Sequence, residues 1–537
     1  MNLIKIFRYE KSWTLLFFIA YLILGLNIYQ DYGLSWDEPI SRLNGLVNVK
    51  YIAENLFPFL LTDSIKTLPD LHNWMDRDYG VAFETPAVVL ERLFNLEETK
   101  EIFIYRHLVT FLFSFLGVVA IYATCKKIYG DYRLGLLAAL MLVLSPRIFA
   151  ESFYNSKDIV FMASIAIAIY TMTNFLAKHS LLWASIHGFC TALAIDIRIM
   201  GILLLLCTLG ALAVQLAKRA MPTQQLRTSA EAYILATCIF VIVMFPFLWA
   251  DPLGNFVLIF KNMANFRWDG SVLYMGEIIK ATNLPWHYIP VWILITTPPL
   301  YIVFMLIGMF ATLKQFISRK FSFWSGNKEM YDMIHLAILT GPIIAVVALA
   351  SVLYDGWRQL YFIYPAFILL SIKGVVTVLN FFKDKKPVKY FITGIFIVSF
   401  SYSGYWIWAA HPLQNIYFNF LIGNDWKNKF ELDYWGLGNR EALQYIVDND
   451  PSPTITVGAD SATPLNRAVI MLDKKDATRI VLSDKESKPL YLLTNYRLVI
   501  DKDDRKYSND YDLFYQKIVF GETILSVFKR KKTANLP

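Results

Sequence analysis

Long, almost uninterrupted runs of apolar residues dominate the pattern of this chain. A helix needs about 20 apolar residues to cross a hydrocarbon core roughly 30 Å thick. Runs of this length recur along the first three quarters of the sequence, starting with Trp13 to Tyr29. The pattern predicts about eleven membrane-spanning helices, at residues 13–30, 102–124, 133–147, 158–177, 181–196, 199–217, 232–249, 287–313, 334–353, 359–380 and 389–409.

Three polar segments separate or follow these runs. A first loop at residues 31–101 contains two amphipathic stretches, Ile40–Leu61 and Tyr79–Phe94, which we expect to lie in the membrane interface. A second loop covers residues 250–286. From about residue 410 the composition becomes polar, which predicts a membrane domain at 1–409 and a small α/β domain at 410–537. Its helix is expected at Arg440–Val447, and its strands at Thr454–Val457, Ile480–Leu482, Leu490–Leu493 and Thr523–Phe528.

Composition supports a mainly α-helical polytopic membrane protein. Of the 537 residues, 56% are hydrophobic and only 18% are charged, whereas soluble domains contain about 25% charged residues. The net charge of +8 gives no reason to expect nucleic acid as a partner, because the basic residues concentrate in short loops. The four cysteines lie in or beside apolar runs and form neither a disulfide framework nor a metal motif.

The distribution of basic residues predicts the orientation. Clusters such as Lys126-Lys127 and Lys218-Arg219 occur at alternate ends of the predicted spans, and positive loops favour the cytoplasm. The N-terminus is therefore predicted to be cytoplasmic, with an uncleaved first span, and the 410–537 domain extracytoplasmic. The chain has no Asn-x-Ser/Thr acceptor, which favours a bacterial inner-membrane protein.

Carboxylates follow the first span in Ser35-Trp36-Asp37-Glu38-Pro39. Acidic groups beside lipid are expensive and usually functional. On the same predicted face, where cations should be scarce, lie Arg147, Lys157, Arg198 and Arg358, with Asp158 next to the lysine. Carboxylates and cations at one level suit a proton acceptor and a phosphate-bearing substrate.

Each of these residues also has an ordinary structural explanation. Asp37 is a favoured helix cap before Pro39. Asn155 or Ser156 can cap the fourth span, where a helix dipole favours Asp158. Arg198 can anchor to lipid headgroups, and Arg358 can pair with Asp355. His72, His287 and His411 are expected to be structural or interfacial, since no spacing resembles a metal site.

Several motifs, taken in order, resemble those of the polyprenyl-phosphate-sugar-dependent membrane glycosyltransferases of the C superfamily. The similarity is to bacterial relatives of the protein O-mannosyltransferases and lipid A aminoarabinose transferases, and it covers most of residues 1–440. It rests on Trp36-Asp37-Glu38, Ser145-Pro146-Arg147-Ile148-Phe149 with Tyr154-Asn155-Ser156-Lys157-Asp158, Trp249-Ala250-Asp251-Pro252, Leu284-Pro285-Trp286-His287-Tyr288, Tyr354-Asp355-Gly356-Trp357-Arg358 and Asp433-Tyr434-Trp435-Gly436.

The resemblance implies an inverting transfer of a sugar from a polyprenyl phosphate to an acceptor hydroxyl at the outer face. Asp37 would be the catalytic base, and Asp158, with Glu38, a supporting acidic residue. Arg198 and Arg358, with Lys157, would bind the donor phosphate. No cofactor is implied; some relatives use a divalent metal, which this branch generally does not need. The acceptor can be a lipid, a glycan or a protein.

Two other functions remain open from the sequence. A transporter or flippase for a lipid-linked sugar would use the same cations without transfer chemistry. However, paired interrupted spans, which inverted repeats would show, are not seen. A scaffold with a degenerate site would not need Asp37, Asp158 and the arginines together.

Overall fold

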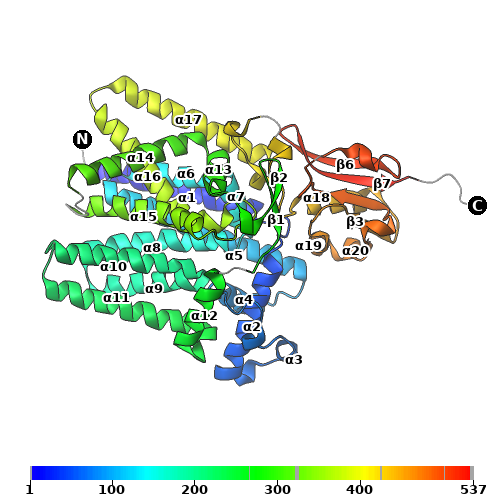
Figure 1. Ribbon diagram of the computed structural model, residues 1–537, viewed down its shortest axis with the longest axis horizontal. Helices are drawn as coiled ribbons and strands as arrows, with labels where there is room; N and C mark the ends of the chain where they lie inside the picture. Colours follow the sequence, from blue (N-terminus) through cyan, green and yellow to red (C-terminus); the bar gives the residue numbers. More distant parts are fainter. Residues whose placement is uncertain (1–2, 265–266, 321–325, 424–425, 501, 532–537) are drawn as a thin grey trace, which may run out of the picture.

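The computed structural model describes residues 3–264, 267–320, 326–423, 426–500 and 502–531. The protein is mainly α-helical (Figure 1). Within the described residues, nine helices are long and apolar enough to cross a membrane, so this is a multi-pass membrane protein. They are α1 (Leu3–Ile28), α5 (Thr99–Tyr129), α8 (Asp158–Lys178), α10 (Ile202–Ala217) with the preceding 3₁₀ turn, α11 (Thr223–Met244), α14 (Pro299–Ser318), α15 (Asn327–Ala348), α16 (Tyr364–Phe381) with the preceding 3₁₀ segment η6 (Arg358–Ile363), and α17 (Lys386–Ala409).

The count differs from the predicted eleven for identifiable reasons. The predicted span at 133–147 is part of a pair, α6 (Tyr132–Val143) and α7 (Pro146–Tyr154), bent by 72°; counted as one span, it makes ten. Helix α9 (Leu181–Ile197) has only 17 residues, about 26 Å of helix. The predicted run at 287–313 still gives one span, α14, but that span begins later than predicted. Pro298 forces Thr297 into an extended conformation, which separates the short helix α13 (Tyr288–Thr296) from α14.

Helix α8 forms the centre of the bundle. In its most apolar window 89% of residues are buried, compared with 11% in α1 and 22% in α17 at the periphery. Helices α5, α9 and α16 pack against it. Close packing elsewhere depends on small residues: a Cβ on Gly308 of α14 would lie 1.9 Å from the Leu370 carbonyl oxygen of α16.

The loops at residues 31–101 and 250–286, named the first and second outer loops after their predicted orientation, form short elements beside one end of the bundle (Figure 1). The first contains α2 (Glu38–Leu56), α3 (Asp63–Lys66) and α4 (Glu84–Leu93), close to the predicted amphipathic stretches. The second contains α12 (Pro252–Ala264) and the hairpin of β1 (Ser271–Tyr274) and β2 (Glu277–Lys280), which the sequence pattern did not predict.

The C-terminal region is a small α/β unit at the end of the molecule opposite the N-terminus (Figure 1). After α18 (Gly438–Asn449), a five-stranded sheet has the order β4-β3-β5-β7-β6. Strands β3 (Ile455–Ala459), β4 (Ile480–Leu482) and β5 (Tyr491–Thr494) are parallel. Strand β7 (Glu522–Arg530) is antiparallel to β5 and to β6 (Tyr511–Val519); β6 was not predicted. The short helices α19 (Leu465–Ile470) and α20 (Lys474–Ala477) lie between β3 and β4.

Candidate active site

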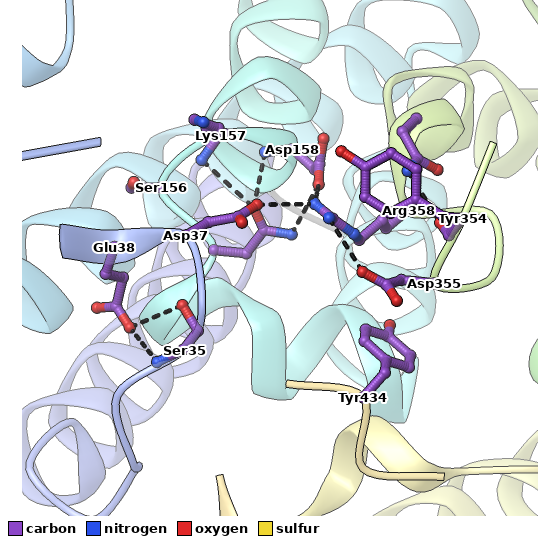
Figure 2. A network of polar contacts seen from close by, with 12 residues as sticks. Ser35, Asp37, Glu38, Ser156, Lys157, Asp158, Tyr354, Asp355, Arg358 and Tyr434 are labelled. Atoms are coloured by element: carbon purple, nitrogen blue, oxygen red, sulfur yellow. Dashed lines mark hydrogen bonds and ion pairs between the residues drawn. The ribbon is translucent and has the colours of Figure 1, made fainter. Parts of the chain in front are cut away.

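Chain segments far apart in sequence meet where the bundle faces the C-terminal domain. They are the start of α2, the start of α8 and the turn that leads into η6 (Figure 2). Asp37 occupies the N-cap position of α2, with Pro39 in the first helical turn, but its side chain makes no capping hydrogen bond. The alternative explanation of Asp37 as a side-chain cap is therefore not supported, and the carboxylate is instead directed towards Arg358.

Arg358 joins three carboxylates. Its Nη1 donates to Asp37 Oδ2 at 3.1 Å and to Asp158 Oδ2 at 2.9 Å, and its Nη2 donates to Asp355 Oδ2 at 3.1 Å. The Arg358 side chain is 2% exposed, whereas that of Asp37 is 31% exposed. The guanidinium also lies 4.5 Å from the ring centroid of Trp435. Arg358 thus holds these carboxylates together, and Asp37 keeps an open side.

Asp158 is fixed at the first turn of α8. Its backbone N–H donates to Asn155 Oδ1 at 2.8 Å, so Asn155 satisfies the first N–H of α8 although the N-cap position itself is Lys157. The Asn155 amide also donates to Asp158 Oδ2 at 3.2 Å. Arg198, which follows α9, pairs with the other carboxylate oxygen of Asp158. Both carboxylate oxygens are therefore engaged, and Asp158 is 1% exposed.

Lys157 supplies a second positive charge beside the open carboxylate. Its ammonium lies 4.5 Å from the ring centroid of Tyr79 in the first outer loop, and no ion pair to it is found among the described residues. Burial alone would raise the pKa of the Asp37 carboxyl, but Arg358 and Lys157, with a smaller contribution from Arg198, hold that pKa below its ordinary value. Asp37 is therefore an ionised, partly exposed carboxylate at neutral pH.

Glu38 points away from this cluster. Its Oε2 accepts from both the backbone N–H and the hydroxyl of Ser35, at 2.8 and 2.9 Å. Its Oε1 lies 2.9 Å from Nε2 of His107 in α5. Adjacent side chains on a helix point in different directions, so Glu38 anchors the start of α2 while Asp37 faces the site (Figure 2).

The C-terminal region reaches the same cluster, which the sequence did not reveal. Arg497 Nη2 donates to Asp355 Oδ1 at 2.7 Å, and its Nε donates to Glu431 Oε1 at 3.3 Å. Burial raises the pKa of Glu431 to about 7 despite the opposing charge of Arg497. Trp435, in the turn that follows Asp433, stacks on the Arg358 guanidinium. Asp433 stabilises this turn, because its Oδ2 accepts a hydrogen bond from the backbone N–H of Gly438 at 2.8 Å.

Two further groups lie at the edge of the cluster, and Glu151 is linked to it because the Asn155 amide donates to Glu151 Oε2 at 2.7 Å as well as to Asp158. Glu151 in α7 accepts from the hydroxyls of Tyr361 and Tyr434 at 3.0 and 3.1 Å, and no motif had marked it. Arg147, expected on the same face, is buried between Trp292 and Phe418 and donates to the Tyr417 carbonyl oxygen. Stacking on these rings takes its guanidinium away from Asp37.

An apolar cavity of about 270 Å³ adjoins the cluster at Arg198. Tyr79, Tyr354 and Gln359 line it with Arg198, and the other lining residues are mostly apolar and come from η3 (Ile199–Gly201), α12, α15, the segment after α15 and η6. The side chain of Arg198 is 21% exposed. A ligand with an apolar chain and an anionic end would match this combination.

The predicted histidines make local contacts. His287 Nδ1 lies 2.7 Å from the Tyr274 hydroxyl, and His411 Nε2 lies 3.0 Å from Asp31 Oδ2. His72 packs edge-on against Tyr51. In the described part of the chain, no group of three or more His, Cys, Asp or Glu residues has the arrangement of a metal site.

Comparison with known proteins agrees with the sequence motifs. Residues 96–249 match the sequence profile of the dolichyl-phosphate-mannose-protein mannosyltransferase family. The match confirms the resemblance inferred from the motifs over this segment, which runs from the start of α5 to the turn after α11. No curated protein sequence matches the chain significantly.

Solved structures with a similar arrangement include two of ArnT from Cupriavidus metallidurans. The complex with undecaprenyl phosphate is 12% identical, with a TM-score of 0.47, and the apo structure is 13% identical, with a TM-score of 0.48; each comparison covers 96% of this chain and 98% of that one. The archaeal oligosaccharyltransferase AglB from Archaeoglobus fulgidus, in complex with an inhibitory peptide and a dolichol-phosphate, is 10% identical. Its TM-score is 0.47, over 98% of this chain and 75% of that one.

Proposed function

We propose that this protein is an inverting glycosyltransferase that moves a sugar from a polyprenyl phosphate to an acceptor hydroxyl at the outer face of the membrane. One observation carries the proposal: Asp37 is a partly exposed carboxylate, surrounded by cations, close to an apolar cavity that ends at Arg198. The name of the family matched at residues 96–249 supports a sugar donor linked to a polyprenyl-type phosphate.

The reaction proceeds in one displacement. The acceptor O–H gives its proton to Asp37 as its oxygen attacks the anomeric carbon. The bond between that carbon and the phosphate oxygen breaks, with inversion, and the polyprenyl phosphate leaves with the bonding pair. Lys157 and Arg198 meet the charge that develops on the phosphate, since both are only half-buried.

The family resemblance implies that Arg358 binds the donor phosphate, whereas its geometry favours a role in holding Asp37. Its two terminal nitrogens already donate to Asp37, Asp158 and Asp355, and its side chain is buried. We therefore assign Arg358 to holding Asp37 ionised and oriented, and we expect its contact with the phosphate to be secondary. Asp158 supports the site by fixing both arginines, and Glu38 supports the loop through Ser35.

The membrane context follows from the same proposal. We place the protein in a bacterial inner membrane with a cytoplasmic N-terminus, which puts the cluster and the C-terminal domain on the extracytoplasmic side. The donor enters laterally from the bilayer through the apolar cavity. The acceptor is a lipid, a glycan or a protein hydroxyl that approaches the exposed side of Asp37.

The proposal is tested in proteoliposomes with labelled undecaprenyl-phosphate sugars and an envelope extract as acceptor. Asp37→Asn should reduce transfer by about 10²- to 10⁴-fold, the usual contribution of a general base, with an unchanged melting temperature. Asp63→Asn is the matched control, since that carboxylate lies in the same loop and is fully exposed. Near-normal turnover by Asp37→Asn would refute the base assignment. Donor movement between leaflets without transfer would favour a flippase.

A further inference from the structure

Arg497 extends from the C-terminal domain to the candidate active site. It follows strand β5 in a short segment in which both neighbours have left-handed backbone conformations, with φ of 58° at Tyr496 and 59° at Leu498. Residues other than glycine seldom adopt this conformation. When they do, the surrounding structure usually requires it. The backbone here is therefore shaped to direct one side chain towards the membrane domain.

Every nitrogen of the Arg497 guanidinium has an acceptor. Nη2 donates to Asp355 Oδ1 at 2.7 Å, Nε donates to Glu431 Oε1 at 3.3 Å, and Nη1 donates to the Tyr434 carbonyl oxygen at 3.3 Å. The side chain is 11% exposed. Three of its five N–H donors are thus used within the protein, one on each nitrogen, which suits a residue that holds other groups in place.

Asp355 links Arg497 to Arg358, which in turn contacts the proposed base Asp37. One of its oxygens accepts from Arg497, and the other accepts from Arg358 Nη2 at 3.1 Å. Arg358 Nη1 is then left to donate to Asp37 and Asp158. The chain of contacts therefore runs from the soluble domain to Asp37 through one shared carboxylate.

Arg497 also approaches the loop of Asp37 from a second direction. Its guanidinium carbon lies 6.0 Å from the ring centroid of Trp36, the residue before Asp37. The same loop is tightly packed against the C-terminal region, because a Cβ on Gly33 would lie 2.6 Å from the Leu437 carbonyl oxygen. Two residues that precede Asp37, Gly33 and Trp36, thus lie against the region after α17.

We propose that Arg497 is a positioning residue that makes the C-terminal domain a working part of the active site. By fixing Asp355, it keeps Arg358 directed at Asp37, and by contacting Trp36 it fixes the loop that carries the base. The inference rests on the proposed function for its kinetic consequences, whereas the positioning itself can be measured without a sugar donor.

Loss of Arg497 should change the acidity of the site. Two carboxylates, Asp355 and Glu431, would lose a cation, and Arg358 would be drawn towards Asp355. Both changes disfavour the ionised form of Asp37, so the acid limb of the pH profile should move up by about one pH unit. The charged and titratable groups that face Asp37 are Lys157, Asp158, Arg198, Arg358, Tyr79 and Tyr354. Those that face Arg497 are Asp355, Glu431 and Arg358.

The test compares R497Q and R497K with R479Q. Arg479 is a suitable control because it lies in the same domain, is 17% exposed, and donates to the carbonyl oxygens of Val447 and Ser452, away from the cluster. R497Q should lower kcat by roughly 10- to 100-fold through misplacement of the base, with the donor KM unchanged and the acid limb shifted upwards. R497K should restore part of both effects. R479Q should lower only the melting temperature.

Hydrogen–deuterium exchange of the donor-free protein separates this inference from the proposed function. R497Q should accelerate exchange in peptides covering residues 33–38 and 354–358, and R479Q should not. If R497Q folds poorly, R497Q/E431Q removes the carboxylate left unpaired and allows the same comparison. Equal exchange in both arginine variants would overturn the inference. Faster exchange in R497Q alone, combined with a wild type that transfers no sugar, would support positioning and refute the proposed function.

Discussion

Two buried arginines, Arg106 and Arg358, each pair with carboxylates of the first outer loop, but the two sets of carboxylates differ in how much they are exposed. Arg106 in α5 pairs with Glu84 and with Glu91, the latter at 3.0 Å, and these side chains are 2%, 8% and 2% exposed. Arg358 is equally buried, but its partner Asp37 is 31% exposed. The first cluster is closed, whereas the second presents a carboxylate to solvent.

The difference indicates what each cluster does. The Arg106 cluster connects α4 to α5, and through Arg42, which donates to Glu91 at 2.8 Å, it also holds α2. The charged groups of this cluster pair with one another. The Arg358 cluster has the same kind of pairing, yet it lies next to a cavity and to Lys157, which has no ion pair within the part of the chain that the structure describes. Burial of charge alone therefore does not mark the site; a partly exposed carboxylate next to a cavity does.

The largest expected effect comes from opening the closed cluster. Arg106→Met leaves Glu84 buried without its cation and leaves Glu91 with Arg42 alone, which should cost about 3–5 kcal/mol of folding free energy. Thermal unfolding in detergent measures the loss. Arg42→Met is the control, because its side chain is 22% exposed and such pairs contribute about 1 kcal/mol or less. Equal stability of the two variants would contradict the distinction between closed and open clusters.

The open cluster should show its own pH dependence of stability, through Glu431. Burial raises the pKa of this carboxyl from 4.5 to about 7 in the folded protein. Between these values the unfolded chain loses a proton that the folded protein keeps, so stability should fall as pH rises from 4.5 to 7, by at most about 3 kcal/mol. Melting temperatures across this range test it. Glu431→Gln should flatten the curve, and Glu441→Gln, on the same domain and 43% exposed, should not.

Lys157 should matter for the donor and not for the fold. Its ammonium contacts the Tyr79 ring and has no carboxylate partner among the described residues. Lys157→Met should therefore raise the donor KM by roughly 10- to 100-fold, the value of one charge-assisted hydrogen bond, with little change in melting temperature. Lys66→Met is the control, since that lysine lies in the first outer loop and pairs only with exposed Asp63. A Lys157 variant with wild-type KM would exclude it from phosphate binding.

Much of the membrane fold was predictable because the thickness of the bilayer sets the length of each apolar run in the sequence. The errors fall where proline or a short helix interrupts that rule, as at Pro298 and in α9. The predicted site residues also share a visible signal: Asp37, Asp158 and Arg358 are charges at the ends of apolar runs, where charge is rare. The structure brings all three together.

Residues of the C-terminal region gave no comparable signal. Arg497 and Glu431 lie in a polar stretch where charged residues are common, so neither stands out by composition. Their contacts arise from the way β5 and the turn after α17 pack against the bundle, which depends on tertiary structure alone. Trp435 was marked only as part of a motif, and its position under Arg358 could not be derived from spacing.

The smallest expected effect tests the contrast between the two acidic neighbours in the first loop. Glu38 faces Ser35 and His107, away from Arg358. The Glu38→Gln variant should therefore keep most of the hydrogen bonds of this side chain and reduce transfer by less than about tenfold. Asp37→Asn should reduce transfer by at least about 10²-fold. The ratio of the two kcat values, measured in the same proteoliposomes, is the decisive quantity. If Glu38→Gln were as damaging as Asp37→Asn while retaining its melting temperature, the base would have to be reassigned to Glu38. Because its carboxylate is 3% exposed, that outcome would also require the loop to rearrange when the acceptor binds.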